Sequence, residues 1–486
     1  MLRAWTVAPS RIVPTRGGAS VSVPAPPRAL SLRANFSWTF IGNIVYAACQ
    51  WAMLVVLAKL GSPEVVGQFA LGLAITAPVI LLTNLQLRAV QATDARREYA
   101  FGDYLGLRLV VTPLALLAIA TITFVSGYGW QTALVILLVG LAKVFESISD
   151  VFYGLLQQHE RMDRIAISMM IKGPLSLAAL TAAIAATGSI VWGAAALAAV
   201  WAIRLVTYDM PSGAAVLHAT RDEREQASIR PRWKWRLLAK LTWLALPLGF
   251  VMMLGSLMTN IPRYFIERFQ GTHELGIFAA MAYIVIAGTT VVDALGQAAS
   301  PRLARLYADG EIGAFRTLAA KVLGISVLLG AAGVLLSLVV GRQVLTLLYR
   351  PEYAEHLDVF IWVIAAAGIG YVASVFGYAL TAARQFTIQV PVYTVSIVVV
   401  VIGCALFVPS HGILGAAWAT FLMFAVQLPL KSAVVLYALR KRATLTPGPL
   451  PILPRERPEG ERESLVIRGR GVGMGDLLSE RAASGE

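Results

Sequence analysis

The sequence carries few charged residues for its length. Only 14% of its 486 residues are charged, whereas 57% are hydrophobic and the mean hydropathy is +0.70. Soluble domains carry about 25% charged residues, and so little charge could not cover the water-facing surface of so long a chain. The composition therefore excludes a series of ordinary soluble domains and indicates a membrane protein.

Cysteine and histidine are also scarce, which excludes several kinds of site. The two cysteines, Cys49 and Cys404, lie inside apolar runs, so they cannot build a disulfide framework or a cysteine-rich metal site. The five histidines are scattered and lack the spacing of metal ligands. The sequence has no Gly-x-x-x-x-Gly-Lys-Ser/Thr phosphate loop, so ATP is not the evident energy source. We therefore expect no metal and no cofactor.

The net charge is high, but its distribution does not point to nucleic acid. Lysine and arginine number 41 against 27 acidic residues, a formal charge of +14. On a soluble protein this excess would suggest nucleic-acid binding. Here the bases lie between apolar runs, so we expect a lipid bilayer as partner and no nucleic acid.

Long apolar runs dominate the chain. A helix that crosses a bilayer needs roughly 20 mostly apolar residues, and the sequence contains about twelve such runs. The predicted fold is therefore an all-α membrane protein with about twelve transmembrane helices. We place these helices at 36–60, 67–92, 105–126, 130–156, 166–187, 190–211, 241–266, 275–300, 317–340, 358–382, 389–408 and 411–437.

The connections between the runs alternate in charge. Short uncharged connections such as 127–129 and 188–189 alternate with basic ones such as 161–164 and 212–240. Cytoplasmic loops carry an excess of lysine and arginine, so both termini are predicted to be cytoplasmic. On this topology the bases towards the outer face are Lys59, Arg263, Arg268, Arg342 and Arg350.

The two ends of the chain differ from its apolar middle. Residues 1–33 contain five arginines and no acid, and the first long apolar run starts only afterwards. This order is not that of a cleavable secretory signal. Residues 438–486 mix bases, acids and prolines, which is typical of disorder. We expect both ends to be disordered cytoplasmic tails.

Two segments in equivalent places of the two halves resemble each other. Residues 61–70 (GSPEVVGQFA) follow the first run, and residues 271–279 (GTHELGIFA) follow the seventh. The similarity predicts an internal repeat, with six-helix lobes at 34–211 and 241–437 joined by a cytoplasmic loop at 212–240. Parallel repeats of this kind occur in transporters whose substrate site lies between the halves.

Polar residues recur at helical spacing in the first, second, seventh and eighth runs. The second run carries Thr76, Asn84, Arg88 and Gln91, and such steps would place the side chains on one helix face. Polar faces towards lipid are costly, so we expect a polar cavity between the lobes, with helix–helix hydrogen bonding as the alternative. The predicted cavity-lining residues are Asn43, Tyr46, Gln50, Asn84, Asn260 and Gln297.

Charged residues inside the runs are rarer and more informative. A charge at the bilayer centre costs about 2.5–3.5 kcal/mol, so it usually has a partner or a function. We expect Lys143 to pair with Glu146, and Lys172 to pair with Asp150 on the neighbouring helix. These pairs could be purely structural or part of the cavity.

Other charges within the runs lack a clear partner. Arg88 and Arg204 have no obvious acid in their own runs, although Asp209 could pair with Arg204. Asp293 lies deep in the eighth run without a nearby base, where it could bind a cation, carry a proton or stay neutral and hydrogen-bonded.

Several segments resemble bacterial oligosaccharide flippases. They include residues 35–50 with Asn43 and Gln50, the hairpin 157–168 (QQHERMDRIAIS) and residues 299–304 (ASPRLA). The resemblance extends over about 35–437, and it is to the polysaccharide-transport (Wzx-type, O-antigen and capsule) branch of the MOP superfamily. It implies a MATE-like, V-shaped pair of lobes in the bacterial inner membrane. Such a protein would flip a polyprenyl-pyrophosphate-linked oligosaccharide from the cytoplasmic to the outer leaflet.

The resemblance also implies roles for the charged residues. A pyrophosphate and its sugars cannot cross hydrocarbon unaided and need a polar, positively charged cavity. The predicted anion-facing bases are Arg88, Arg204, Arg263, Lys143 and Lys172. The candidates for coupling to Na⁺ or H⁺ are Asp293, Glu146 and Asp150. Polysaccharide polymerase or export proteins are the expected protein partners.

Two other functions compete with this interpretation. A cation-coupled multidrug antiporter of the same superfamily would need uncompensated acids in its cavity, whereas the candidate residues include more bases than acids. A membrane-embedded polysaccharide polymerase or ligase would need an outer loop with acid, base or metal chemistry. No connection predicted on the outer face offers such a platform.

Overall fold

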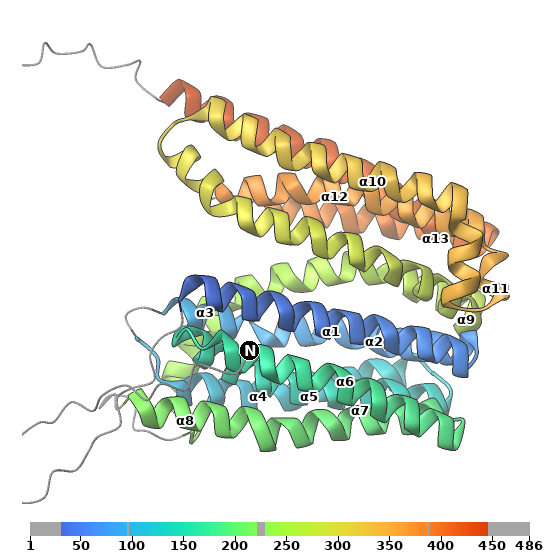
Figure 1. Ribbon diagram of the computed structural model, residues 1–486, viewed down its shortest axis with the longest axis horizontal. Coiled ribbons are helices and arrows are strands. Elements are labelled where there is room, and N and C mark those ends of the chain that lie inside the picture. Colours follow the sequence, from blue (N-terminus) through green and yellow to red (C-terminus); the bar gives the residue numbers. More distant parts are fainter. Residues whose placement is uncertain (1–30, 95–96, 221–228, 384, 386–387, 446–486) are drawn as a thin grey trace, which may run out of the picture.

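The computed structural model describes residues 31–445 except for 95–96, 221–228, 384 and 386–387. Within these ranges every regular element is a helix (Figure 1). Most of the two predicted tails lies outside the described residues. The helices of the first part are α1 (Leu32–Leu60), α2 (Pro63–Asn84), α3 (Leu87–Thr93), α4 (Phe101–Val125), α5 (Trp130–Gln158), α6 (Met162–Thr187), α7 (Ile190–Arg204), a π-helical turn η1 (Leu205–Asp209) and α8 (Met210–Thr220). The second part contains α9 (Trp235–Ala308), α10 (Ile312–Leu348), α11 (Pro351–Ala354), α12 (Leu357–Ala382) and α13 (Gln389–Leu445).

Ten helical segments of the described chain are long and apolar enough to cross a membrane. The 74 residues of α9 would form a straight rod about 110 Å long, far more than the roughly 30 Å of a hydrocarbon core. Instead α9 turns back on itself (Figure 1), and its backbone is non-helical at Gly271. α13 is interrupted in the same way at Gly412. Both glycines have a positive φ, 86° and 56°, which side chains rarely tolerate.

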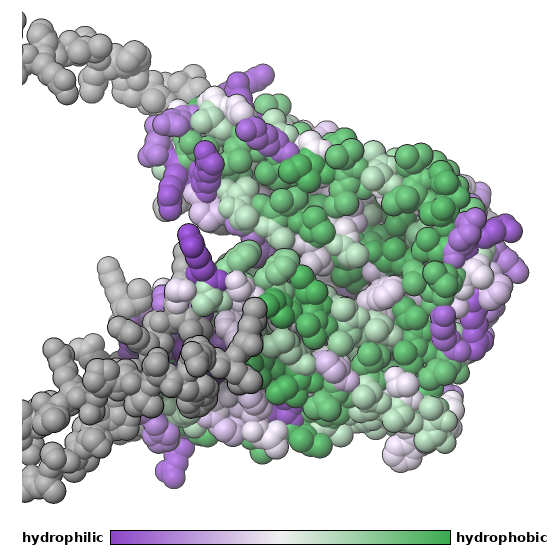
Figure 2. All heavy atoms as spheres, in the orientation of Figure 1, coloured by the Kyte–Doolittle hydropathy of each residue, from purple (hydrophilic) through white to green (hydrophobic). Residues whose placement is uncertain are grey.

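The helices form two bundles that meet at one end and separate at the other (Figure 1). One bundle contains α1 to α8, and the other contains α10, α12 and α13, while α9 packs against α2, α12 and α13. Figure 2 shows hydrophobic side chains across the middle of both bundles and hydrophilic ones at the two ends. It also shows a cleft between the bundles at the end where α9 begins. The predicted all-α membrane fold is confirmed.

The predicted helix 67–92 is wrong as one continuous helix. α2 ends at Asn84 and α3 begins at Leu87, because Leu85 and Gln86 adopt left-handed conformations with φ of 52° and 51°. The Leu85 and Leu87 side chains are buried in one apolar cluster, and their packing holds the break in place. Thr76, Asn84, Arg88 and Gln91 therefore do not share the face of one helix. Thr76 and Asn84 precede the break, and Arg88 and Gln91 follow it.

α2 and the second half of α9 cross very closely at the end where the bundles meet. A Cβ atom added to Gly67 would overlap the Thr272 carbonyl oxygen, and one added to Gly276 would overlap the Pro63 carbonyl oxygen. Gly67 and Gly276 are equivalent positions of the two similar segments in the sequence. The contact is therefore reciprocal, and only glycine leaves enough room for it at either position.

We expect Gly276→Ala to destabilise the protein, because the added methyl group must push two helix backbones apart. Overpacking of this kind costs about 1–3 kcal/mol, so the Tm in detergent should fall. Gly255→Ala in the same helix is the matched control, since a Cβ there meets nothing within 4 Å. Equal Tm values for the two variants would contradict this account of the crossing.

Candidate functional site

A polar pocket of about 460 Å³ lies inside the first bundle. α1, α2, α3, α5 and α6 all contribute to its wall, together with the left-handed residue that precedes α3. Its polar and charged lining residues are Tyr46, Asn84, Gln86, Arg88, Glu146, Ser147, Asp150, Tyr153, Gln157 and Lys172. The structure thus brings together six of the predicted site residues, from four separate helices and the end of α2.

One carboxylate in this pocket is shared by two lysines. Lys143 Nζ lies 2.8 Å from Glu146 Oε2, as predicted, and Lys172 Nζ contacts Glu146 Oε1. Tyr46 donates its hydroxyl proton to the same Oε1 at 3.0 Å. The predicted pairing of Lys172 with Asp150 is wrong, because Lys172 meets α5 one helical turn earlier, at Glu146.

The second carboxylate, Asp150, lies near two arginines instead. Its oxygens are 3.6 Å from Arg88 Nη1 and 3.9 Å from Arg108 Nη2. Arg88 also donates from Nε to Gln157 at 2.9 Å. As expected it has no acid in its own run, and its carboxylate partner Asp150 comes from α5. Arg108 is fully buried and donates to both the side chain and the carbonyl oxygen of Asn84. Sequence reasoning missed Arg108, although it lies inside a predicted span.

Arg204 lies away from this pocket. Its guanidinium is buried and bonds Asp209 at 2.8 Å, Ser149 at 2.9 Å and Tyr153 at 2.6 Å. The π-helical turn of Leu205–Asp209 follows at once, and its extra residue per turn allows Asp209 to return to the arginine. The predicted Arg204–Asp209 pair is confirmed, but the structure does not bring Arg204 to a position that faces an anion.

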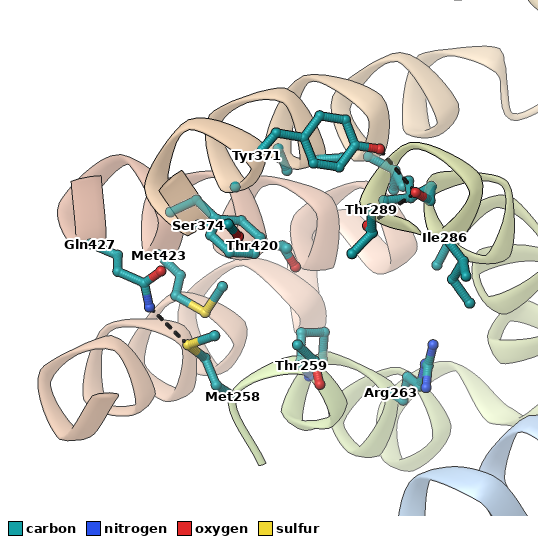
Figure 3. A pocket seen from close by; sticks show the side chains of 18 of the residues that line it. Met258, Thr259, Arg263, Ile286, Thr289, Tyr371, Ser374, Thr420, Met423 and Gln427 are labelled. Atoms are coloured by element: carbon teal, nitrogen blue, oxygen red, sulfur yellow. Dashed lines mark hydrogen bonds between the residues drawn. The ribbon is translucent and has the colours of Figure 1, made fainter. Parts of the chain in front are cut away.

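A second pocket, of about 450 Å³, lies inside the other bundle between α9, α12 and α13 (Figure 3). Arg263 lines it and donates from Nη1 to Asn260 Oδ1 at 2.7 Å. Asn260 donates from Nδ2 to the Ser256 carbonyl oxygen at 2.9 Å. This bond fixes the amide, which in turn orients the Arg263 guanidinium. Hydroxyls from Thr259, Thr289, Tyr371, Ser374, Tyr393 and Thr420 complete the polar lining.

Lys431 is the second base of this pocket, and sequence reasoning missed it. It lies within the predicted span 411–437, so the search for charges inside apolar runs could have found it. No acidic residue lines the pocket. The two bases therefore face the pocket without a carboxylate among its lining residues.

The remaining predicted residues lie outside both pockets. Asn43 and Gln297 are exposed, and Gln50 is half-buried. Asp293 accepts a hydrogen bond from the Tyr378 hydroxyl at 3.0 Å. In the described part of the chain there is no cluster of histidine, cysteine or acidic residues able to hold a metal.

Polar contacts join the two bundles where they meet. His273, in the connection between the two halves of α9, lies 2.6 Å from Glu64 at the start of α2 and 3.1 Å from Glu352 on α11. Arg350 donates to the Lys59 carbonyl oxygen at 2.9 Å. These contacts lie beyond the apolar membrane-crossing segments and hold this end closed.

The fold identifies the class of protein. An inward-facing structure of a multidrug resistance MATE transporter of the MOP superfamily superposes with a TM-score of 0.65 at 13% identity, over 83% of this chain and 99% of that one. An inward closed structure of the lipid II flippase MurJ gives 0.63 at 11% identity, over 84% and 90%. An outward-facing MATE structure gives 0.55 at 15% identity, over 85% and 95%. The chain shares the fold of these MATE and MurJ structures.

The sequence then gives the family. Residues 32–307 match the family described as "Polysaccharide biosynthesis protein". The "Capsular polysaccharide biosynthesis protein CapF" of Staphylococcus aureus is 30% identical over 385 residues, which cover 79% of this chain and 94% of that protein. The chain belongs to this family, as its resemblance to the flippases predicted. By family and fold it is a multi-pass membrane protein with a bacterial homologue.

We expect Glu146→Gln to destabilise the first bundle, because it leaves Lys172 buried without its counter-charge. Removing one partner of a buried ion pair costs about 3–5 kcal/mol, which should appear as a lower Tm. Adding Lys172→Met should recover part of that loss, while the exposed Glu311→Gln is the control. Strictly additive effects in the double variant would contradict the shared carboxylate.

The His273 contacts should make the closed end sensitive to pH. Burial alone would lower the pKa of His273, but the Glu64 hydrogen bond and the charges of Glu64, Glu352 and Glu274 raise that pKa above its ordinary value. The charged imidazole therefore stabilises the closed end at low pH, and this contribution is lost as pH rises through the raised pKa.

Spin labels placed on both sides of this end would measure the effect. The fraction of closed molecules should fall with rising pH in the unaltered protein and be insensitive in His273→Ala. His218→Ala, at an exposed histidine of α8, is the control. An unchanged pH profile in His273→Ala would exclude this histidine as the cause.

Proposed function

We propose that this protein flips a polyprenyl-pyrophosphate-linked oligosaccharide from the cytoplasmic to the outer leaflet during polysaccharide assembly. The observation that carries the proposal is the excess of bases over acids, both in the charged cluster around the first pocket and in the lining of the second. Lipid headgroups with phosphates and sugars need such an environment in the middle of a bilayer. MurJ, which has the same fold, is itself described as a lipid II flippase.

The charge balance favours an anionic substrate over an organic cation. Two bases that line the first pocket, Arg88 and Lys172, share the acids Glu146 and Asp150 with two bases next to it, Arg108 and Lys143. The second pocket has two bases and no acidic lining residue. A multidrug antiporter that binds cations would need the opposite excess, so we regard that alternative as weaker.

A separate groove offers a path for the lipid tail. It has a volume of about 700 Å³ and runs between α1 and the second half of α9, where the two bundles face each other. Its walls are almost entirely apolar, with Phe40, Ile44 and Trp51 on one side and Tyr283 and Leu295 on the other. A prenyl chain in this groove could stay in contact with lipid while the headgroup occupies the polar interior.

The topology supports transport between the two leaflets. If the reversals at Gly271 and Gly412 each separate two crossings, the ten segments become about twelve, with lobes near 34–211 and 241–437 and both termini on one side. The basic connections at the open end support a cytoplasmic location for that side. The substrate would then enter through the cleft seen in Figure 2.

Rocking of the two lobes would expose the pockets alternately to the two sides. Opening of the outer end requires the contacts of His273 and Arg350 to break. Asp293 is the first candidate for coupling to Na⁺ or H⁺, since its partner in the described part of the chain is the Tyr378 hydroxyl, whereas Glu146 and Asp150 are already paired with bases. Polymerase or export proteins would take up the flipped product.

We expect Arg88→Gln and Arg263→Gln each to reduce flipping at least tenfold, since each removes a charge that faces the headgroup. The measurement is translocation of a prenyl-pyrophosphate-linked oligosaccharide in proteoliposomes of purified protein. Arg342→Gln, at an exposed position of α10, should leave the rate unchanged. Full transport by both pocket variants would refute the assignment, and transport of organic cations by the unaltered protein would favour the antiporter.

A further inference from the structure

Lys431 is a buried charge with no acidic residue among the residues that line its pocket. Its residue is only 6% exposed, although it lies on a helix of the membrane domain. Its ammonium is 5.5 Å from the centre of the Tyr393 ring, and it would be 3.7 Å from a Cβ atom on Gly377. These neighbours offer a weak cation–π contact and no opposite charge.

A buried ammonium without a counter-ion costs stability. Burial of a charge is tolerated when it is paired, hydrogen-bonded or required for function. In the other bundle, the buried bases Arg204 and Lys172 are each paired with a carboxylate. Lys431 has no such partner among the residues that line its pocket, so the missing negative charge is expected on a ligand.

The register of two helices places Lys431 at a different depth from Arg263. α9 and the second half of α13 run antiparallel, because Gln270 contacts Val408 near the turn while Met258 contacts Gln427 further in. Arg263 lies five residues from Met258 towards the turn. Lys431 lies four residues from Gln427 in the opposite direction, away from the turn. At 1.5 Å a residue, their Cα atoms are offset by about 13 Å along the bundle.

In Figure 3 Arg263 and Gln427, the residue one helical turn before Lys431, lie at opposite ends of the labelled side chains. An offset of this size is several times the spacing of two linked phosphates, and it is closer to the length of two or three sugar rings. The two bases are therefore placed for negative charges on separate parts of one extended ligand.

The surroundings of Lys431 are those of a sugar site. Gln427 donates to the Ser396 hydroxyl oxygen at 3.1 Å and so holds its amide at the pocket wall. Tyr393 presents an aromatic ring, and Ser374 adds a hydroxyl. Amide and hydroxyl groups beside an aromatic face suit a ligand that is polar at its edges and apolar on its faces.

We propose that Lys431 forms a second oxyanion subsite, which binds the carboxylate of an acidic sugar within the oligosaccharide. This rests on the proposed flippase function and adds a substrate class to it, a glycan that carries uronic acid. A phosphate of the carrier is the other source of an oxyanion, and the experiment separates the two.

The test compares two prenyl-pyrophosphate-linked trisaccharides that differ only in one sugar, a uronic acid or the matching neutral hexose. Lys431→Gln should lower translocation of the acidic probe at least tenfold and that of the neutral probe less than twofold. Lys431→Arg should retain most of the preference, because it keeps the charge. Lys321→Gln, at an exposed lysine of α10, is the control.

A stability measurement separates a binding role from a structural one. Because Lys431 is buried without an opposite charge, Lys431→Gln should leave the Tm unchanged or raise it, and the free acidic trisaccharide should raise the Tm of the unaltered protein only. An equal loss with both probes would mean that Lys431 serves the pyrophosphate or the fold, and no loss with either would exclude a subsite. Both results overturn the inference. Failure of the unaltered protein to move either probe would instead overturn the flippase function itself.

Discussion

The close crossing of α2 and α9 is the constraint on which the arrangement of the two bundles depends. Gly67 and Gly276 let two helix backbones touch at one end of the molecule, while the contacts of His273 tie the same end together. While these contacts hold, the bundles separate at the other end, as they do in Figure 1. The cleft and the groove between α1 and α9 follow from this geometry.

The two bundles manage their buried charges in different ways. In the first bundle each carboxylate serves two bases, so positive charge accumulates without any base being left alone. In the second bundle Arg263 is oriented by a neutral amide, and Lys431 by little more than an aromatic ring. In the first arrangement the bases are already neutralised when no ligand is bound. In the second, an incoming anion would supply the missing opposite charge and so would stabilise the bundle more.

The sequence was sufficient to predict the all-α membrane fold and the Lys143–Glu146 pair, because apolar length and helical spacing are local properties. It was not sufficient for the break at Leu85 and Gln86, since neither residue favours a left-handed backbone and only tertiary packing holds them there. Partners on different helices were harder still to predict. The observed partner of Lys172, Glu146, lies one helical turn from the predicted partner, Asp150. Arg108 and Lys431 could have been found, because both are charges inside apolar spans.

The break between α2 and α3 gives the first pocket a mechanical property. A left-handed conformation costs about 1–2 kcal/mol for each residue with a side chain, so this segment holds roughly 2–4 kcal/mol in its backbone. Rewinding it into a continuous helix would remove that cost, but it would disturb the packing of Leu85 and Leu87 and change the position of Arg88 relative to Asp150. The segment is thus locally strained, and its conversion to a continuous helix would change the electrostatic potential at a headgroup inside the bundle.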